Sequence, residues 1–308
     1  MSNEGLVYFS GDFVLESQAG IPLNDPGVGY GHMVFEVTRT YKHVPFRLDR
    51  HLERLYASMK SAEIDPGMTL REMDEATLVT LEKNIHRFEP DDDVFIGHTV
   101  SNGPASGRPT IFISVNSLAG VLVERSPFYE AGVEAVVTTQ RSIPARLQDP
   151  KVKSRSRIHY ALATIEAKRV NPEAWALLTD DDGFITEGSF NNFLIVSNGE
   201  LISPEPRNIL LGVTRGDIIE LAAQEGIPYR ESNIGVYEVL NADEAFYCGT
   251  THVIMPVCKV NGHAIGLSAP GPVTREFIQA FKRLVGMDYE AQGMWYARRH
   301  DTISAAAG

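Results

Sequence analysis

The chain has 308 residues, enough for one large or two ordinary domains with a buried core. Its 43% hydrophobic and 22% charged residues are typical of a globular protein, and its formal charge of -12 argues against general nucleic-acid binding, which requires a basic face. A local basic pocket for an anionic ligand stays compatible with this charge. No segment approaches the roughly 20 apolar residues of a membrane helix, and the N-terminus lacks the pattern of a signal peptide. Cys248 and Cys258 lie in apolar, strand-like stretches and are interpreted as reduced core residues, so we expect a cytoplasmic protein.

The first part of the chain predicts a small α+β domain over residues 1–118. Leu52, Leu55 and Met59 fall on one face of a helix that Asp49 can cap, which gives that helix an apolar side for a sheet. The predicted elements are a hairpin over 6–16, a strand over 33–41, helices over 50–63 and 69–87, and strands over 93–101 and 109–117.

The segment 119–132 has no clear hydrophobic period and is interpreted as an interdomain connection. Residues 133–308 predict a larger domain, in which strands mix with helices without the steady alternation of a doubly wound sheet. The predicted elements are strands over 133–139 and 174–179, a hairpin over 184–203, strands over 228–232, 244–249 and 253–260, and helices over 155–169, from Thr214 onward, and over 272–285.

Lys153 lies in a basic segment just before a predicted helix. A lysine that forms a Schiff base with an aldehyde must be desolvated enough to lower its pKa, so it usually faces a cleft. The alternative interpretation of this segment is a solvated basic turn. The residues that follow favour the first interpretation.

Glu187 and two glycine-threonine turns provide the other groups that pyridoxal phosphate (PLP) requires. A carboxylate beside the pyridine nitrogen keeps the ring cationic, and Glu187 ends a predicted strand. Gly212-Val213-Thr214 precedes a helix, whose first N–H groups form a natural phosphate site, and Gly249-Thr250-Thr251 offers a second set of donors. Each motif alone also fits an ordinary strand or turn; the set in this order predicts a PLP site.

Nearly the whole chain resembles the class IV (fold type IV) PLP-dependent aminotransferases, which include branched-chain, D-amino-acid and (R)-amine transaminases and aminodeoxychorismate lyase. The resemblance implies a small N-terminal α/β sandwich-like domain, a larger C-terminal mixed β-barrel-like domain with helices, a site between the domains, and a homodimer. The matching stretches are Gly29–Glu36, His51–Leu55, Leu162-Ala163, Glu166-Ala167, Glu187–Ser189, Asn192-Phe193, Leu211–Arg215, Ala242–Phe246 and Gly249-Thr250.

The same resemblance implies a role for each site residue. It selects Lys153 rather than Lys151 as the Schiff-base residue and proton shuttle, because Glu166-Ala167 follows Lys153 at the spacing of D-amino-acid-type members. Glu187 would pair with the pyridine nitrogen. The residues that would hold the phosphate are Arg54, Val213, Thr214 and Thr250.

The chain departs from the family where the substrate is selected. Gly97 stands where branched-chain members have an arginine, and the loop 101–108 retains only Arg108, out of register, of the arginine and histidine of D-amino-acid transaminases. Arg155 and Arg157 flank the lysine instead; Arg157 stands at a position that touches the cofactor region in relatives. Either cation would lower the pKa of Lys153 or attract a substrate carboxylate. The candidate pocket walls are Tyr30, Phe35, His98 and Thr251.

These observations predict a PLP-dependent aminotransferase that moves an amino group from a D-amino acid or primary amine to a 2-keto acid. Three alternatives stay open: a branched-chain L-amino-acid aminotransferase, a PLP-dependent lyase resembling aminodeoxychorismate lyase, and a non-catalytic PLP-fold binding protein. We expect small-molecule substrates and neither a metal, a nucleic acid nor a membrane as partner.

Overall fold

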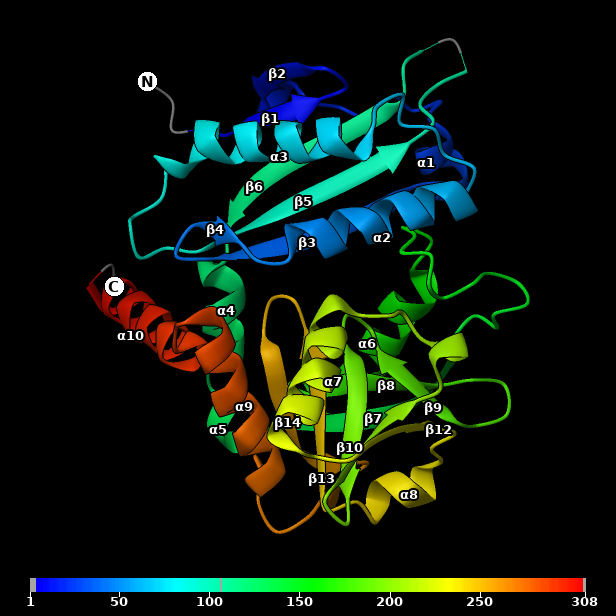
Figure 1. Ribbon diagram of the computed structural model, residues 1–308, viewed down its shortest axis with the longest axis vertical. Helices are drawn as coiled ribbons and strands as arrows, with labels where there is room; N and C mark the ends of the chain where they lie inside the picture. Colours follow the sequence, from blue (N-terminus) through cyan, green and yellow to red (C-terminus); the bar gives the residue numbers. More distant parts are fainter. Residues whose placement is uncertain (1–3, 106, 307–308) are drawn as a thin grey trace. The chain divides into compact units, whose positions relative to one another are not determined.

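The computed structural model describes residues 4–105 and 107–306, with side chains described up to residue 299. The chain forms two compact units, each with its own sheet (Figure 1). The first unit comprises Met1–Ala119 with Val152–Arg157, and the second comprises Gly120–Lys151 with Ile158–Gly308. No helix within the described ranges is long and apolar enough to cross a membrane.

The first unit is a six-stranded sheet covered on one face by two helices. Its strand order is β2-β1-β6-β5-β3-β4, and each neighbouring pair is antiparallel. The strands are β1 (Leu6–Phe9), β2 (Asp12–Leu15), β3 (Val34–Tyr41), β4 (Val44–Pro45), β5 (Val94–Ser101) and β6 (Thr110–Ser117).

The helices of this unit are α1 (Pro26–Tyr30), α2 (Leu48–Ser61) and α3 (Leu70–Ile85). Thr69 and Glu72 form a capping box that begins α3, with each side chain satisfying a backbone N–H group at the helix start. The apolar faces of α2 and α3 pack on the sheet and bury Leu52, Leu55 and Met73 completely. This core holds β3 and β5 in place, and both strands carry candidate site residues.

A short segment from a distant part of the sequence extends the sheet beside the first half of β3. Val34 forms an antiparallel bridge with Ser154, the Phe35 amide donates to the Lys153 carbonyl (3.0 Å), and the Arg155 amide donates to the Met33 carbonyl (2.8 Å). These backbone bonds explain why Val152–Arg157 belong to the first unit although the flanking residues belong to the second.

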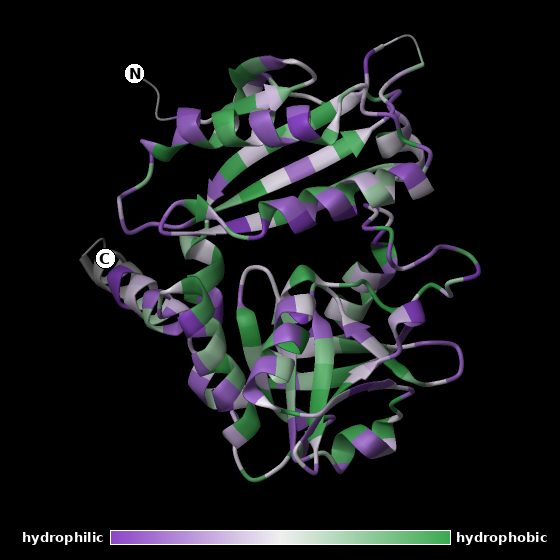
Figure 2. Cartoon of the chain, in the orientation of Figure 1, coloured by the Kyte–Doolittle hydropathy of each residue, from purple (hydrophilic) through white to green (hydrophobic). Residues whose placement is uncertain are grey.

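The second unit is built around a closed mixed sheet. Its order is β12-β11-β10-β13-β14-β7-β8-β9, and β9 also pairs with β10 through Glu187 and Asn192, which closes a ring. Hydrophobic residues concentrate on these strands (Figure 2). The strands are β7 (Val133–Arg141), β8 (Trp175–Thr179), β9 (Ile185–Gly188), β10 (Asn192–Ser197), β11 (Glu200–Pro204), β12 (Tyr229–Ser232), β13 (Glu244–Gly249), β14 (Val253–Val260) and β15 (His263–Ala264).

Helices flank this barrel. α6 packs on β7 and β8, and α7 packs against β13 and α9. The helices are α4 (Ala119–Arg125), α5 (Phe128–Ala131), α6 (Ile158–Val170), α7 (Val213–Glu225), α8 (Val236–Leu240), α9 (Pro272–Val285) and α10 (Tyr289–Ala306).

The structure differs from the predicted elements in several places. The helix predicted over 155–169 begins only at Ile158, because the preceding segment is extended and its residues 153–155 bond to Met33, Val34 and Phe35. The segment 119–132, interpreted as a connection, contains α4 and α5. The helix α10 was not predicted, because its sequence lacks a strong apolar period; Tyr289 is buried and anchors its start.

Candidate active site

Every second residue of the segment beside β3 is a cation, from Lys153 to Arg157. Lys153, Arg155 and Arg157 are spaced two residues apart, and successive side chains of an extended chain point to opposite sides. The three side chains therefore share one side. The Lys153 Nζ lies 4.8 Å from the centre of the Phe35 ring, and the guanidinium carbons of Arg155 and Arg157 lie 4.0 and 5.5 Å from it. The structure thus gathers the predicted lysine and both flanking arginines around the ring of Phe35.

Arg155 is held by an aromatic ring and one hydrogen bond. It stacks on Phe35 and donates one hydrogen bond to the Thr99 hydroxyl (3.1 Å), on the strand next to β3. Burial lowers the pKa of its guanidinium, and the neighbouring charge of Arg157 lowers it further. Among the residues whose side chains are described, Arg155 forms no salt bridge.

Arg54 forms a forked ion pair with the buried Glu36. Its Nε and Nη2 atoms lie 2.6 and 2.8 Å from the two carboxylate oxygens, and His51 Nδ1 lies 2.9 Å from one of them. Burial alone would raise the pKa of Glu36, but the charge and hydrogen bonds of Arg54 and the hydrogen bond of His51 hold it well below its usual value. Burial is also the main cause that lowers the pKa of His51. The pair fixes the plane of the guanidinium that is predicted to bind phosphate.

His98 does not line the same surface as Phe35. In the β3–β5 register Phe35 pairs with Thr99 and Glu36 pairs with His98, so His98 points to the opposite, helix-covered face. Its Nε2 lies 2.8 Å from the Thr77 hydroxyl of α3, and burial lowers its pKa to about 4. The prediction of His98 as a pocket wall is therefore not supported, because strand alternation puts it in the core. Tyr30, at the end of α1, is 85% exposed.

In the second unit, Glu187 is buried at the end of β9 and accepts hydrogen bonds at both carboxylate oxygens. The Tyr160 hydroxyl donates to one oxygen (2.5 Å), and the Asn192 amide (3.0 Å) and the Leu210 backbone N–H (3.1 Å) donate to the other. Carboxylates accept charge-assisted hydrogen bonds from such donors and are oriented by them. Tyr160 and Asn192 both contact this candidate residue, and the sequence analysis gave neither of them a role.

The glycine turn before α7 lies against the same group. Gly212 is the N-cap and Val213 begins the helix, so the first N–H groups of α7 are those of the predicted phosphate site. A Cβ atom at Gly212 would lie 2.1 Å from Asn192 Oδ1. Asn192 therefore links the helix start to Glu187, and a side chain at position 212 would displace the Asn192 amide.

Arg125 contacts the turn Gly249-Thr250-Thr251. This arginine lies in the segment 119–132, which the sequence analysis interpreted as an interdomain connection. Arg125, at the end of α4, hydrogen-bonds the Thr251 hydroxyl, and its Nη1 lies 3.0 Å from His252 Nδ1. Its guanidinium carbon lies 5.6 Å from the centre of the Trp175 ring. No sequence motif marks Arg125, because its partners come from a distant turn.

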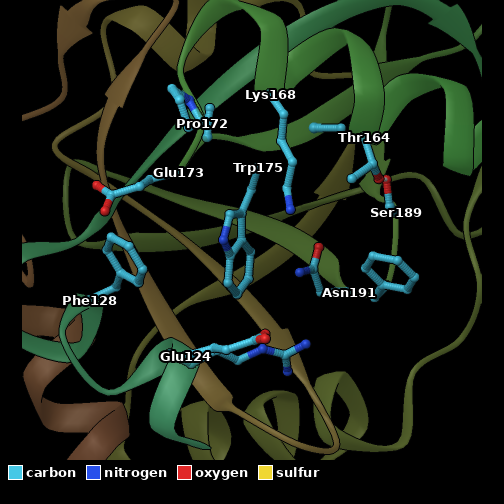
Figure 3. A pocket seen from close by; sticks show the side chains of 13 residues that line it. Glu124, Phe128, Thr164, Lys168, Pro172, Glu173, Trp175, Ser189 and Asn191 are labelled. Atoms are coloured by element: carbon cyan, nitrogen blue, oxygen red, sulfur yellow. Dashed lines mark hydrogen bonds between the residues drawn. The ribbon is translucent and has the colours of Figure 1, made fainter. Parts of the chain in front are cut away.

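A cavity of about 380 Å³ adjoins this arginine. In Figure 3 Trp175 stands in the cavity, and the Lys168 side chain runs beside it toward Asn191. Glu124 and Glu173 add acidic groups to the lining. The cavity is a recess of the second unit that is lined by aromatic side chains and by charged side chains of both signs.

These two sets of groups fit PLP chemically. The first unit supplies an amine beside an aromatic ring and an oriented arginine fork, which suit an aldehyde and a phosphate. The second supplies a buried, oriented carboxylate and a glycine-capped helix start, which suit a pyridinium N–H and a phosphate. No group of three or more potential metal-ligating side chains occurs in the described part of the chain.

Comparisons with known proteins identify the family. The family model described as amino-transferase class IV matches residues 33–260. The chain belongs to the class IV aminotransferases. A Methanocaldococcus jannaschii protein named as a putative branched-chain-amino-acid aminotransferase is 35% identical over 90% of this chain and 95% of its own length. The D-alanine aminotransferase of Bacillus licheniformis is 27% identical over 91% of this chain and 96% of its own length.

Solved structures agree. The branched-chain aminotransferase of Thermoproteus uzoniensis with norvaline has a TM-score of 0.81 and 28% identity, and covers 95% of this chain and 98% of its own. A branched-chain amino acid aminotransferase complexed with N-(5'-phosphopyridoxyl)-L-glutamate has a TM-score of 0.82 and 25% identity, over 94% and 97% of the two chains. This class IV aminotransferase is thus a PLP-dependent transaminase with the α+β fold type IV architecture, which confirms the predicted family, fold class, cofactor and enzyme type.

Proposed function

We propose that this class IV aminotransferase takes the amino group of a branched-chain L-amino acid and passes it to a 2-keto acid in two half-reactions. The similarity to the M. jannaschii protein carries this proposal. The geometry agrees, because the ring of Phe35 gives the lysine an apolar neighbour on which an aliphatic side chain can pack. This revises the expected preference for a D-amino acid or primary amine.

We propose the following roles for the chain's own residues. Bound PLP supplies an aldehyde and an electron-withdrawing ring. The Lys153 amine holds that aldehyde and moves the proton at the donor's α-carbon, and Glu187 holds the pyridine N–H. The phosphate is proposed to bind Arg54, Val213, Thr214 and Thr250, with Arg157 close to the cofactor.

The substrate walls are proposed to be Phe35, Tyr30 and Thr251. Phe35 is supported by its contact with Lys153, and Thr251 by its place beside Thr250 and its bond to Arg125. His98 is left out because it lies on the helix-covered face.

A D-amino-acid donor is the second candidate. The D-alanine aminotransferase of B. licheniformis matches the chain over 91% of its length, and Gly97 lacks the arginine of branched-chain members. The stereochemistry of the donor therefore has to be measured directly.

The visible absorption of the PLP-loaded protein distinguishes the candidates. We expect L-leucine to bleach the cofactor band and 2-oxoglutarate to restore it, while D-alanine and (R)-1-phenylethylamine leave it unchanged at equal concentration. Bleaching by D-alanine alone contradicts the branched-chain proposal in favour of the second candidate. Pyruvate released from a donor without any keto acid indicates the lyase alternative, and no response to any donor indicates a binding protein.

We also propose that the protein acts as a cytoplasmic homodimer. Ile158, Leu162 and Ile165 lie on one face of α6 and are 75%, 44% and 48% exposed, which suits burial against a second copy. Both described cysteines are free thiols, as in a reducing compartment. Light scattering would give the mass of two chains; the mass of one would contradict the dimer.

A further inference from the structure

Arg155 stands beside the proposed catalytic lysine with most of its hydrogen-bonding capacity unused. A guanidinium carries five N–H donors, and the Thr99 hydroxyl takes one of them. Among the side chains described up to residue 299, it has no acidic partner. An arginine held on an aromatic ring, partly desolvated and without a counter-ion is a receptor for a carboxylate.

The acidic group nearest in sequence to Phe35 is already engaged. Glu36 follows Phe35 on β3 and therefore points to the opposite face, where Arg54 and His51 occupy both of its oxygens. Three cationic side chains lie over the Phe35 ring: those of Lys153, Arg155 and Arg157. An anion that binds Arg155 offsets the repulsion between Arg155 and Arg157.

The position of Arg155 suits the distant carboxylate of a substrate rather than the cofactor. Lys153 and Arg155 contact the same ring, so a substrate whose nitrogen exchanges with the Lys153 amine lies next to this guanidinium. The aliphatic side chain of one substrate can pack on Phe35, and the distal carboxylate of a dicarboxylic substrate can reach the Arg155 guanidinium. Phe35 and Arg155 together thus accommodate both kinds of substrate side chain.

We propose that Arg155 is a specificity-determining residue that binds the distal carboxylate of a dicarboxylic substrate, 2-oxoglutarate or glutamate, and that Thr99 positions it. This rests on the proposed function, whose keto acid it specifies as dicarboxylic. The related aminotransferase that was solved with a phosphopyridoxyl-L-glutamate shows that a protein of this fold holds such a chain.

The test measures binding of two unreactive acids to the PLP-loaded protein by calorimetry. Glutarate has a distal carboxylate and 4-methylpentanoate does not. We expect Arg155→Met to weaken glutarate binding about 100-fold, as expected for loss of a charge-assisted pair, and to change 4-methylpentanoate binding less than about 3-fold. Arg155→Lys keeps the charge without the fork and should weaken glutarate about 10-fold.

Thr99→Val removes only the positioning hydrogen bond and should weaken glutarate about 5-fold, again without affecting 4-methylpentanoate. Arg169→Met, at an exposed site of α6, is the control and should change neither acid. With the substrates themselves, Arg155→Met should raise KM for 2-oxoglutarate more than it raises KM for L-leucine.

Unchanged glutarate binding in Arg155→Met, or equal weakening of both acids, overturns the proposal. Loss of the PLP absorption band in Arg155→Met at saturating PLP also overturns it, because the arginine then serves the cofactor. If the unaltered protein transaminates no donor, the proposed function fails. If it is active but Arg155→Met does not separate the two acids, the inference alone fails.

Discussion

At the residue scale, the site depends on a spacing of two. The sequence Lys153-x-Arg155-x-Arg157 is compatible with a solvated basic turn, and composition alone favours that interpretation. The structure shows it instead as an extended segment that bonds to β3 and turns all three cations to Phe35. The residue types were predictable; their common side was not, because it depends on a pairing partner more than 100 residues earlier in the chain.

His98 illustrates the opposite case. A histidine close to candidate pocket residues was predicted as a wall, but strand alternation puts its ring between the sheet and α3. Its Nδ1 atom is buried without a partner among the described residues, so a proton there would be an unsatisfied donor. Burial accordingly lowers its pKa to about 4.

This pKa predicts a loss of stability in mild acid. The unfolded histidine, with a pKa of about 6.5, takes up a proton as the pH falls, whereas the folded one stays neutral down to about 4. His98 alone should therefore remove about 2 kcal/mol of unfolding free energy between pH 7 and pH 5. Urea unfolding at both pH values should show this loss, and His98→Gln should remove about that part of it.

The exposed His263 provides the control for this measurement. His263→Gln should leave the difference between pH 7 and pH 5 unchanged. An equal pH dependence in the unaltered protein and His98→Gln would contradict the assignment. The buried His51, whose pKa burial also lowers, contributes with the same sign and remains in both proteins.

At the element scale, the start of α7 and the end of β9 form one assembly. The glycine turn and the helix were predictable from the sequence, because Gly-x-Thr precedes an apolar helix. The side chain that joins them was not: Asn192 hydrogen-bonds both Glu187 and the Leu210 carbonyl, and fills the space in which Gly212 would carry a Cβ.

Two glycine substitutions distinguish the effect of the contact between Gly212 and Asn192 from the effect of helix propensity in α7. Gly212 has φ -63° and ψ 138°, which alanine adopts freely, so Gly212→Ala acts only through its clash with Asn192. We expect it to displace Asn192, disturb Glu187 and weaken PLP binding about 10-fold or more, measured by spectral titration. Gly216→Ala, inside α7 with no atom within 4 Å of the added Cβ, should bind PLP normally and gain about 0.5–1 kcal/mol of stability.

Equal PLP affinity in Gly212→Ala and the unaltered protein would show that the Asn192 side chain can move without disturbing Glu187. Reduced affinity in Gly216→Ala would show instead that any change in α7 disturbs the site. Either result would contradict the link through Asn192.

At the scale of the whole molecule, the sequence predicts an α+β chain with a small and a large domain, and the fold class is confirmed. Two features of the fold could not be predicted from local sequence patterns. The barrel closes through a single pairing of Glu187 with Asn192, and the first unit takes up Val152–Arg157 from a later part of the chain. Both depend on long-range backbone bonds, for which hydrophobic periodicity carries no signal.

The first unit therefore contains Lys153, the proposed Schiff-base residue. The amine of Lys153 lies against Phe35, whereas Lys151, two residues earlier, pairs with the exposed Asp149 at 2.9 Å. An amine held against an aromatic ring is placed to react with an aldehyde, whereas Lys151 is engaged at the surface.

The most direct test is to reduce the PLP-loaded protein with borohydride, digest it and locate the pyridoxyl group by mass spectrometry. We expect the label on Lys153, its loss in Lys153→Arg, and its retention in Lys151→Arg. A label on Lys151, on another lysine, or on none would contradict the central claim that Lys153 holds the cofactor.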